Sequence, residues 1–246
     1  MKKKIIAGVV LARAGSKGFK HKNLLKLNGE YLTARAISLA LKNRKIDVVI
    51  FSSDSKKILN TFPNHKRVFK ILRDKKLSKD KTSSLDVLIN SINLFEEKNP
   101  LNKIDYLVGL DPTAPLRKNE DISKAMKFFE RNKPDVLVSV HNCQHNPYFS
   151  MLEKKGRYFK LPKKINSIKD PSSRQEVPKI YEINTLVWIH SRKIILDLKK
   201  RLSEKTLVYK FPYERSIDID TQDDIDKINY YLNKKNAKIK NYFTFN

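Results

Sequence analysis

Cysteine is almost absent from this chain of 246 residues, which contains one, Cys143. A single cysteine excludes an intramolecular disulfide and a metal cluster built from cysteines. No pattern around Cys143 indicates a catalytic thiol, so we interpret it as structural. His65, His141, His145 and His190 lack metal-ligand spacing, and we interpret them as structural too.

The sequence also lacks an apolar run long enough to cross a bilayer. Its first ten residues, MKKKIIAGVV, have the basic start and apolar continuation of a signal peptide. The apolar run is short, however, and Arg13 and Lys17 interrupt it without a small-residue cleavage site. A first β-strand explains this segment better, and we expect a soluble, cytoplasmic protein without a membrane partner.

Acidic residues are few, since 26 Asp and Glu accompany 52 Lys and Arg and give a formal net charge of +26. Such a balance is compatible with nucleic-acid binding through counterion release. Lysine recurs in every predicted helix and turn without forming a basic stripe, so we favour an evenly basic surface and no nucleic-acid partner. The charge would still attract a polyanionic small substrate such as a nucleoside triphosphate.

The chain does contain an alternation of strand-like and helix-like segments. This βαβαβ rhythm predicts an α/β fold with a mostly parallel sheet, in a single domain over residues 1–246. Ligands of such sheets bind at the carboxyl ends of the strands. A break in the rhythm at about 141–175 predicts an inserted flap or dimerisation segment. Strands are predicted at residues 5–11, 48–52, 68–72, 106–110, 135–140, 186–190 and 207–211, and helices at 32–41, 56–60, 82–97, 121–131 and 222–232.

A candidate phosphate-binding loop follows the first predicted strand, where residues 11–23 read LARAGSKGFKHKN. Its glycines allow backbone N–H groups to approach an anion, while Arg13, Lys17 and Lys22 supply positive charge. The spacing matches neither the P-loop motif nor GxGxxG. Phosphate binding is the favoured interpretation, and an ordinary strand–helix connection is the alternative.

A candidate metal site lies near the other end of the chain, in Ser216-Ile217-Asp218-Ile219-Asp220. Residues two apart in an extended segment point the same way, so Asp218 and Asp220 present two carboxylates to one point. Mg²⁺ prefers such oxygen ligands, often beside substrate phosphates. The alternative, that an Asp or Thr221 caps the helix predicted from residue 222, is compatible with metal binding.

A third segment, residues 110–117, follows a predicted strand directly and reads LDPTAPLR. Its two prolines predict a rigid loop at the binding edge of the sheet, although a simple turn would explain the segment taken alone.

Taken together and in this order, the segments resemble the acylneuraminate cytidylyltransferases over nearly the whole chain. The loop at 11–23, followed by Leu27-Asn28-Gly29, and the Ser-Ile-Asp-Ile-Asp segment carry the most specific likeness. It continues through Ser52-Ser53-Asp54, Arg73, Thr82-Ser83-Ser84, Pro112-Thr113-Ala114-Pro115-Leu116-Arg117, Arg174-Gln175 and Asn184.

The resemblance implies a Rossmann-like three-layer α/β/α nucleotidyltransferase fold and a homodimer whose central excursion reaches the partner's site. It implies that the anomeric hydroxyl of a 2-keto sugar acid attacks the α-phosphate of CTP in line, releasing pyrophosphate. The implied catalytic residues are Arg13, Lys22 and Asp220, and the implied Mg²⁺ ligands are Asp218 and Asp220. The implied nucleotide-binding residues are Leu11, Ala12, Arg13, Gly15, Ser16, Lys17, Lys22, Asn23, Arg73 and Ser84. The implied acceptor-binding residues are Asp111, Thr113, Arg174, Gln175, Glu182 and Asn184.

Two positions depart from the family pattern, with Asp111 in place of a Gln and Glu182 in place of an Arg. Acids there disfavour a bare carboxylate and favour an amino group or additional hydroxyl on the acceptor. We therefore expect a modified nonulosonic acid or related acceptor, whose carboxylate Arg174 remains available to bind. The alternatives are another acceptor or NTP on the same fold, a non-catalytic homologue, and a basic nucleic-acid-binding protein.

Overall fold

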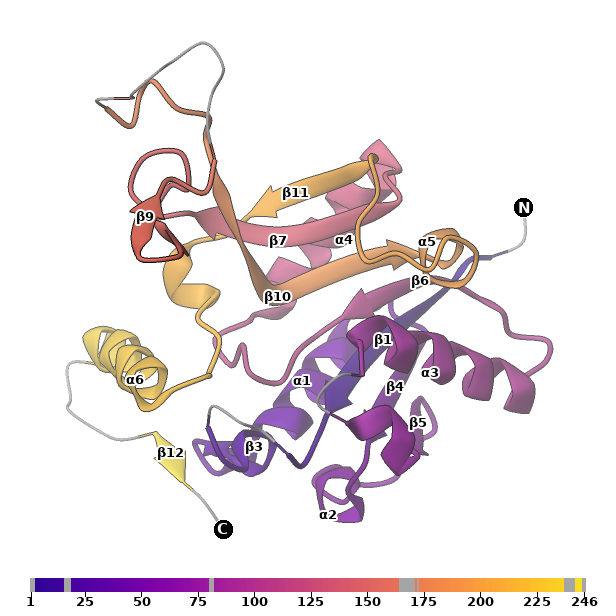
Figure 1. Cartoon of the computed structure of the whole chain (residues 1–246). Coiled ribbons are helices and arrows are strands. Elements are labelled where there is room, and N and C mark those ends of the chain that lie inside the picture. The colour runs from indigo at the N-terminus through magenta and orange to yellow at the C-terminus, as the bar shows by residue number, and fades with distance from the viewer. Residues whose placement is uncertain are drawn as a thin grey trace.

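The computed structural model describes residues 3–15, 19–79, 82–163, 171, 173–236 and 242–244, with the backbone alone for 235–236. Its centre is a seven-stranded sheet (Figure 1). Every strand pair in it is parallel except those of one strand, β10, which runs antiparallel to both neighbours. The order across the sheet is β11 (Thr206–Lys210), β7 (Val136–Asn142), β10 (Tyr181–Ser191), β6 (Ile104–Gly109), β1 (Ile5–Ala12), β4 (Val48–Ser53) and β5 (Val68–Leu72).

Helices cover both faces of this sheet and make the three layers that the motifs imply. Helices α1 (Leu32–Lys42), α2 (Lys56–Leu59) and α4 (Asn119–Asn132) share one apolar core with the sheet. Helices α3 (Ser84–Lys98) and α5 (Arg192–Leu196) share the core of the opposite face. In α4, the buried residues Ile122, Ala125, Met126 and Phe129 recur at helical spacing, which is why this segment folds as a one-sided helix.

A third core joins the two ends of the chain. Helix α6 (Gln222–Asn236) packs with a small sheet of β12 (Phe243–Thr244), β2 (Lys26–Leu27) and β3 (Glu30–Tyr31). Asn28 and Gly29 have φ values of 53° and 80° and turn β2 into β3, a conformation that Asn and Gly tolerate best. The Asn28 N–H donates to the Tyr242 carbonyl at 2.8 Å. The C-terminal segment is thus fixed beside the chain that follows β1.

The predicted excursion contains a hairpin of β8 (Glu153–Lys155) and β9 (Tyr158–Lys160), near the edge where β7 ends and β10 begins (Figure 1). Leu152, Tyr158 and Phe159 of this region are 66%, 67% and 62% exposed. Short 3₁₀ helices complete the fold: η1 (Lys22–Leu24), η2 (Lys75–Ser78) and η3 (Tyr213–Arg215). No helix among the described residues is both long and apolar enough to span a membrane.

The predicted strands and helices are present, with shifts at their ends. The helix expected from residue 82 begins at Ser84, because the Ser83 side chain caps it by accepting the Asp86 N–H at 3.1 Å. The strand expected at 186–190 extends over Tyr181–Ser191. Helix α5 and the strands β2, β3, β8, β9 and β12 were not predicted, since segments of two to five residues carry little periodicity.

Candidate active site

The carboxyl ends of β1, β4, β5, β6 and β7 meet at one edge of the sheet, and most of the predicted site residues lie there. Leu11 and Ala12 end β1, Arg73 follows β5, and Asp111 and Thr113 follow β6. Ser84 is the first residue of α3, whereas Lys22 and Asn23 lie in η1. Ser16 and Lys17 lie outside the described residues, so their predicted roles stay predictions.

The loop after β1 is held in place through its backbone. Asp54, after β4, accepts the Ala14 N–H at 2.8 Å, and the Asn23 amide donates to the Arg13 carbonyl at 2.9 Å. The Arg73 guanidinium donates to the Ala12 carbonyl at 3.0 Å. Burial lowers the pKa of Arg73, which Asp54 partly offsets. Asn23 and Arg73 therefore both shape the loop that carries Arg13 and Gly15.

Lys22 connects this loop to the distant aspartate segment. Its ammonium lies 2.6 Å from Asp220 Oδ1 and donates to the Ile219 carbonyl at 3.0 Å, although 198 residues separate Lys22 from Asp220. The two segments that the sequence singled out thus form one site. Since Lys22 is mostly buried there, its positive charge is fixed beside the carboxylates.

In the aspartate segment, burial alternates between the isoleucines and the aspartates. Ile217 and Ile219 are buried in the third core, and the Ile219 N–H donates to the Thr113 carbonyl at 2.9 Å. Asp220 is exposed. Asp218 is half-buried, and burial raises the pKa of its carboxyl, while the hydroxyl of Thr113 and the charge of Lys22 act in the opposite direction.

The donor set at this point fits a hard cation. Asp218 Oδ1 is buried without a hydrogen-bond partner in the part of the chain that the structure describes. No group of three or more His, Cys, Asp or Glu side chains in that part is placed to hold a metal. A cation at Asp218 and Asp220 would therefore need further oxygens from substrate or water. Asp224 supplies the helix cap, because its carboxylate accepts hydrogen bonds from the N–H groups of Asp220 and Thr221 at 3.1 and 2.9 Å.

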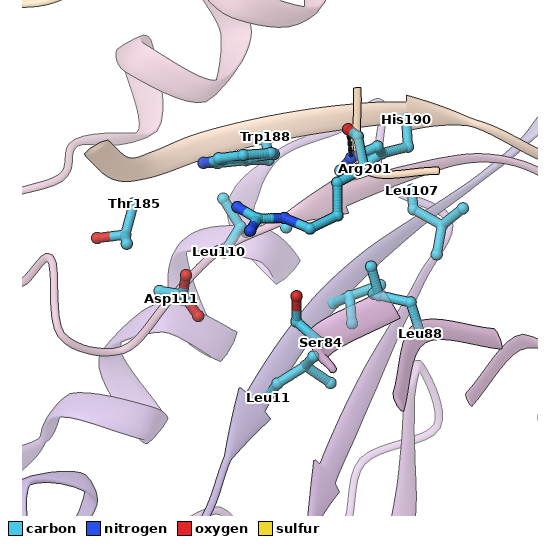
Figure 2. A pocket seen from close by; sticks show the side chains of 12 residues that line it. Leu11, Ser84, Leu88, Leu107, Leu110, Asp111, Thr185, Trp188, His190 and Arg201 are labelled. Carbon is cyan, nitrogen blue, oxygen red and sulfur yellow. Dashed lines mark hydrogen bonds between the residues drawn. The ribbon is translucent and has the colours of Figure 1, made fainter. Parts of the chain in front are cut away.

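Two adjoining pockets open at this edge of the sheet, and they share Leu11, Ser84 and Asp111. The first contains half of the residues predicted for the nucleotide. Its lining consists of Leu11, Ala12, Arg13, Arg73, Leu77, Ser78, Lys79, Thr82, Ser84, Val87 and Asp111. The second, drawn in Figure 2, is lined by Val9, Leu11, Ser84, Leu88, Leu107, Gly109, Leu110, Asp111, Thr185, Trp188, His190 and Arg201.

Asp111, between the two pockets, is a carboxyl whose charge is disfavoured. Burial is the main reason that its pKa rises to about 6, and the nearby Asp218 adds to the effect. Arg117, Lys22 and Arg201 oppose it. The Arg117 guanidinium itself is buried and binds the carbonyls of Asp111, Thr185 and Leu186, so it ties the Asp-Pro-Thr loop to β10. Burial lowers the pKa of Arg117 to about 10.

Glu182 and Asn184 converge on a histidine that the sequence interpretation set aside. His141 is 7% exposed, and its Nε2 lies 3.3 Å from Glu182 Oε2. Its Nδ1 lies 3.1 Å from Ser216 Oγ and 3.3 Å from the Asn184 amide nitrogen. His141 therefore links the start of β10 to the segment that carries Asp218. No spacing in the sequence signals this, because β10 reaches β7 only after the excursion.

Arg174 and Gln175 do not line either of the two pockets at Asp111. Both are exposed, and Arg174 lines a separate pocket with Asn142, Cys143, His145, Tyr181 and Lys210. That pocket shares no lining residue with the two at Asp111. Sequence interpretation also missed Trp188, His190 and Arg201 of the second pocket. Arg201 had no distinguishing signal, because it ends a Lys-Lys-Arg run in a chain with 52 basic residues.

A profile of the cytidylyltransferase family matches residues 7–242, and the chain belongs to that family. Two curated relatives are each 28% identical over 233 residues, which cover 95% of this chain and 97% of theirs. They are a post-translational flagellin modification protein B from Campylobacter coli and a CMP-N,N′-diacetyllegionaminic acid synthase from Campylobacter jejuni. The family predicted from the motifs is confirmed.

A solved structure of CMP:2-keto-3-deoxy-manno-octonic acid synthetase complexed with CTP has a similar fold, with a TM-score of 0.63. The match covers 94% of this chain and all of that one at 14% sequence identity. The three-layer nucleotidyltransferase fold is thereby confirmed.

Proposed function

We propose that this chain transfers CMP from CTP to the anomeric hydroxyl of a sialic-acid-like 2-keto sugar acid and releases pyrophosphate. The observation that carries the proposal is the contact of Lys22 with Ile219 and Asp220, which joins an anion-binding loop to a pair of carboxylates. Membership of the cytidylyltransferase family supports CTP as the donor.

In this proposal Arg13, Lys22 and the backbone around Gly15 bind the triphosphate, while Arg73 and Ser84 line the pocket for cytidine. Lys22 is placed to exchange its Asp220 partner for a phosphate oxygen. Mg²⁺, held through Asp218 and Asp220, would neutralise charge on the phosphates. The chain itself contributes positioning and charge complementarity, which are the main requirements of phosphoryl transfer.

The acceptor is proposed to be a nonulosonic acid, since the relative from Campylobacter jejuni is named for a diacetyllegionaminic acid. The Asp111 carboxylate would accept hydrogen bonds from the hydroxyl and amide groups of the acceptor. The hydroxyls of Thr113 and Thr185 could either donate hydrogen bonds to these groups or accept them. The apolar walls at Leu88, Leu107 and Leu110 suit acyl or deoxy substituents. Glu182 and Asn184, which both contact His141, would form one wall of the acceptor site.

We also propose a homodimer that uses the predicted insertion. Its support is the group of exposed apolar side chains in and beside the β8–β9 hairpin, because such groups mark protein interaction sites. We expect the enzyme to act in the cytoplasm, where nucleoside triphosphates are available.

The test is pyrophosphate release from each of the four NTPs with Mg²⁺ and a set of acceptors. The set contains N-acetylneuraminic acid, N,N′-diacetyllegionaminic acid and, as a control of another class, a hexose 1-phosphate. We expect release with CTP and a nine-carbon acid. Release with another NTP, or only with the hexose 1-phosphate, would contradict the proposal. Binding of RNA or DNA in preference to CTP at physiological salt would favour a nucleic-acid function instead.

A further inference from the structure

The second pocket has a basic residue at its mouth that none of the recognised motifs contains. Arg201 lies between α5 and β11, and its guanidinium is 5.1 Å from the centroid of the Trp188 ring. Figure 2 shows this guanidinium beneath the indole, on the side of the pocket where Asp111 and Thr185 lie. Stacking of a planar guanidinium on Trp fixes its orientation while its N–H donors stay available.

The loop that carries Arg201 is anchored from inside the sheet. His190, 5% exposed, lies with its Nε2 3.2 Å from the Arg201 carbonyl, and its ring stacks on Trp188 with centroids 5.7 Å apart. Trp188 is held in turn by its indole N–H, which donates to the Asn184 carbonyl at 2.8 Å. Two rings of β10 therefore position Arg201: Trp188 contacts its guanidinium, and His190 contacts its backbone carbonyl.

The Arg201 guanidinium has no hydrogen-bond or ion-pair partner in the described part of the chain. Asp111 faces it across the pocket, and the positive charge of Arg201 acts on that carboxyl. An arginine fixed in this way at a pocket mouth offers a fork of donors that matches a carboxylate.

We propose that Arg201, supported by Trp188 and His190, binds the carboxylate of the acceptor sugar acid. This inference rests on the proposed function and deepens it. It differs from the expectation that Arg174 takes the carboxylate, because within one chain Arg174 lines a pocket that shares no residue with the one containing Asp111.

The experiment uses Trp188, the single tryptophan of the chain, as an intrinsic fluorophore inside the pocket. N-acetylneuraminic acid, N,N′-diacetyllegionaminic acid and the methyl ester of each are titrated into the full-length protein, with and without CMP. The ester retains every group of the sugar except the charged carboxylate. We expect the wild type to bind at least one acid roughly tenfold or more tightly than its ester, about 1.4 kcal/mol in binding free energy.

In Arg201→Met the preference for the acid should disappear, with the affinity for the ester unchanged. Arg201→Lys, which keeps the charge but loses the fork, should retain part of the preference. The matched control is Lys200→Met in the same loop, which should keep the preference of the wild type. A full preference for the acid in Arg201→Met, its loss in Lys200→Met, or no fluorescence response to either acid would overturn the assignment.

A separate measurement of CTP turnover with the acids distinguishes failure of the proposed function from failure of the role of Arg201. If the acids are turned over while Arg201→Met still prefers acid over ester, the proposed function stands and the role of Arg201 is wrong. If neither acid supports pyrophosphate release, the proposed function fails, whatever the fluorescence titration shows.

Discussion

Asp218 and Asp220 are two residues apart, and the fold gives their carboxylates different surroundings. Asp218 is half-buried against Thr113, with one oxygen that lacks a hydrogen-bond partner among the described residues. Asp220 is exposed and paired with Lys22 at 2.6 Å. A buried oxygen without a partner costs free energy unless something binds it, so the pair is suited to a cation shared with the substrate phosphates.

Asp220→Asn should reduce Mg²⁺-dependent turnover on the order of 100-fold, because it removes one of the two proposed carboxylate ligands of the cation. Asp223→Asn, an exposed acid three residues further on, is the matched control and should retain nearly full activity. Initial rates over a series of Mg²⁺ concentrations measure both. Undiminished turnover in Asp220→Asn would contradict the metal assignment.

The lowered pKa of His190 makes the free energy of unfolding depend on pH. Burial lowers the pKa of His190 from 6.5 to about 4, so between these values the unfolded chain binds more protons than the folded one. The stabilisation is complete above pH 6.5 and is lost as the pH falls toward 4. Wild type should lose about 2 kcal/mol more of its unfolding free energy between pH 7 and pH 5 than His190→Gln does, because Gln does not titrate.

Urea unfolding of both proteins at the two pH values measures this difference. Equal losses in wild type and His190→Gln would show that folding does not lower the pKa of His190.

At the scale of elements, Arg117 fixes the site by joining the Asp-Pro-Thr loop to β10. Its side chain is 2% exposed and binds three carbonyls from residues 111, 185 and 186. Strand β10 bulges between Ile183 and Trp188, where the Asn184 side chain accepts the Leu186 N–H at 3.1 Å. The loop and the bulge together define the wall that carries Asp111 and Thr185.

Arg117→Met should destabilise the protein by about 3 kcal/mol, because one buried and two partly buried carbonyls lose their charged donor. Arg131→Met, at an exposed position of α4, is the control and should change stability by less than about 0.5 kcal/mol. Urea unfolding monitored by circular dichroism compares them. A shift in Arg117→Met no larger than in the control would contradict the structural role of this guanidinium.

The long elements were predictable because their patterns are local. Residues 5–12 form an apolar strand and α4 presents apolar residues at helical spacing, so both follow from neighbouring residues. The antiparallel direction of β10 and the approach of Arg201 to Asp111 depend on how the chain returns after residue 142, which no local pattern encodes. The Lys22–Asp220 contact was predictable only through the family likeness, since 198 residues separate the partners.

At the scale of the whole molecule, the two ends of the chain close on the active site. The third core places α6 and the segment before it against β2 and β3, directly after the loop that carries Arg13 and Lys22. The excursion lies at the same edge of the sheet, with exposed aromatic side chains on β9. The proposed dimer would cover the exposed apolar side chains of this excursion.

Phe159→Glu should convert a wild-type dimer into a monomer, because it places a charge in the proposed interface. Tyr230→Glu is the matched control, since Tyr230 on α6 is 61% exposed against 62% for Phe159. Sedimentation equilibrium of the three proteins gives their masses. A monomeric wild type, or a dimer that survives Phe159→Glu but not Tyr230→Glu, would contradict the proposed use of the hairpin.

We propose that the β1 loop and the Asp218/Asp220 pair together perform cytidylyl transfer to a sugar acid. The most direct test is mass spectrometry of the product formed from CTP, Mg²⁺ and N,N′-diacetyllegionaminic or N-acetylneuraminic acid. We expect a product with the mass of the acid plus CMP less one water, together with one pyrophosphate for each product molecule. Consumption of CTP to CMP or CDP without a CMP-linked sugar would contradict it.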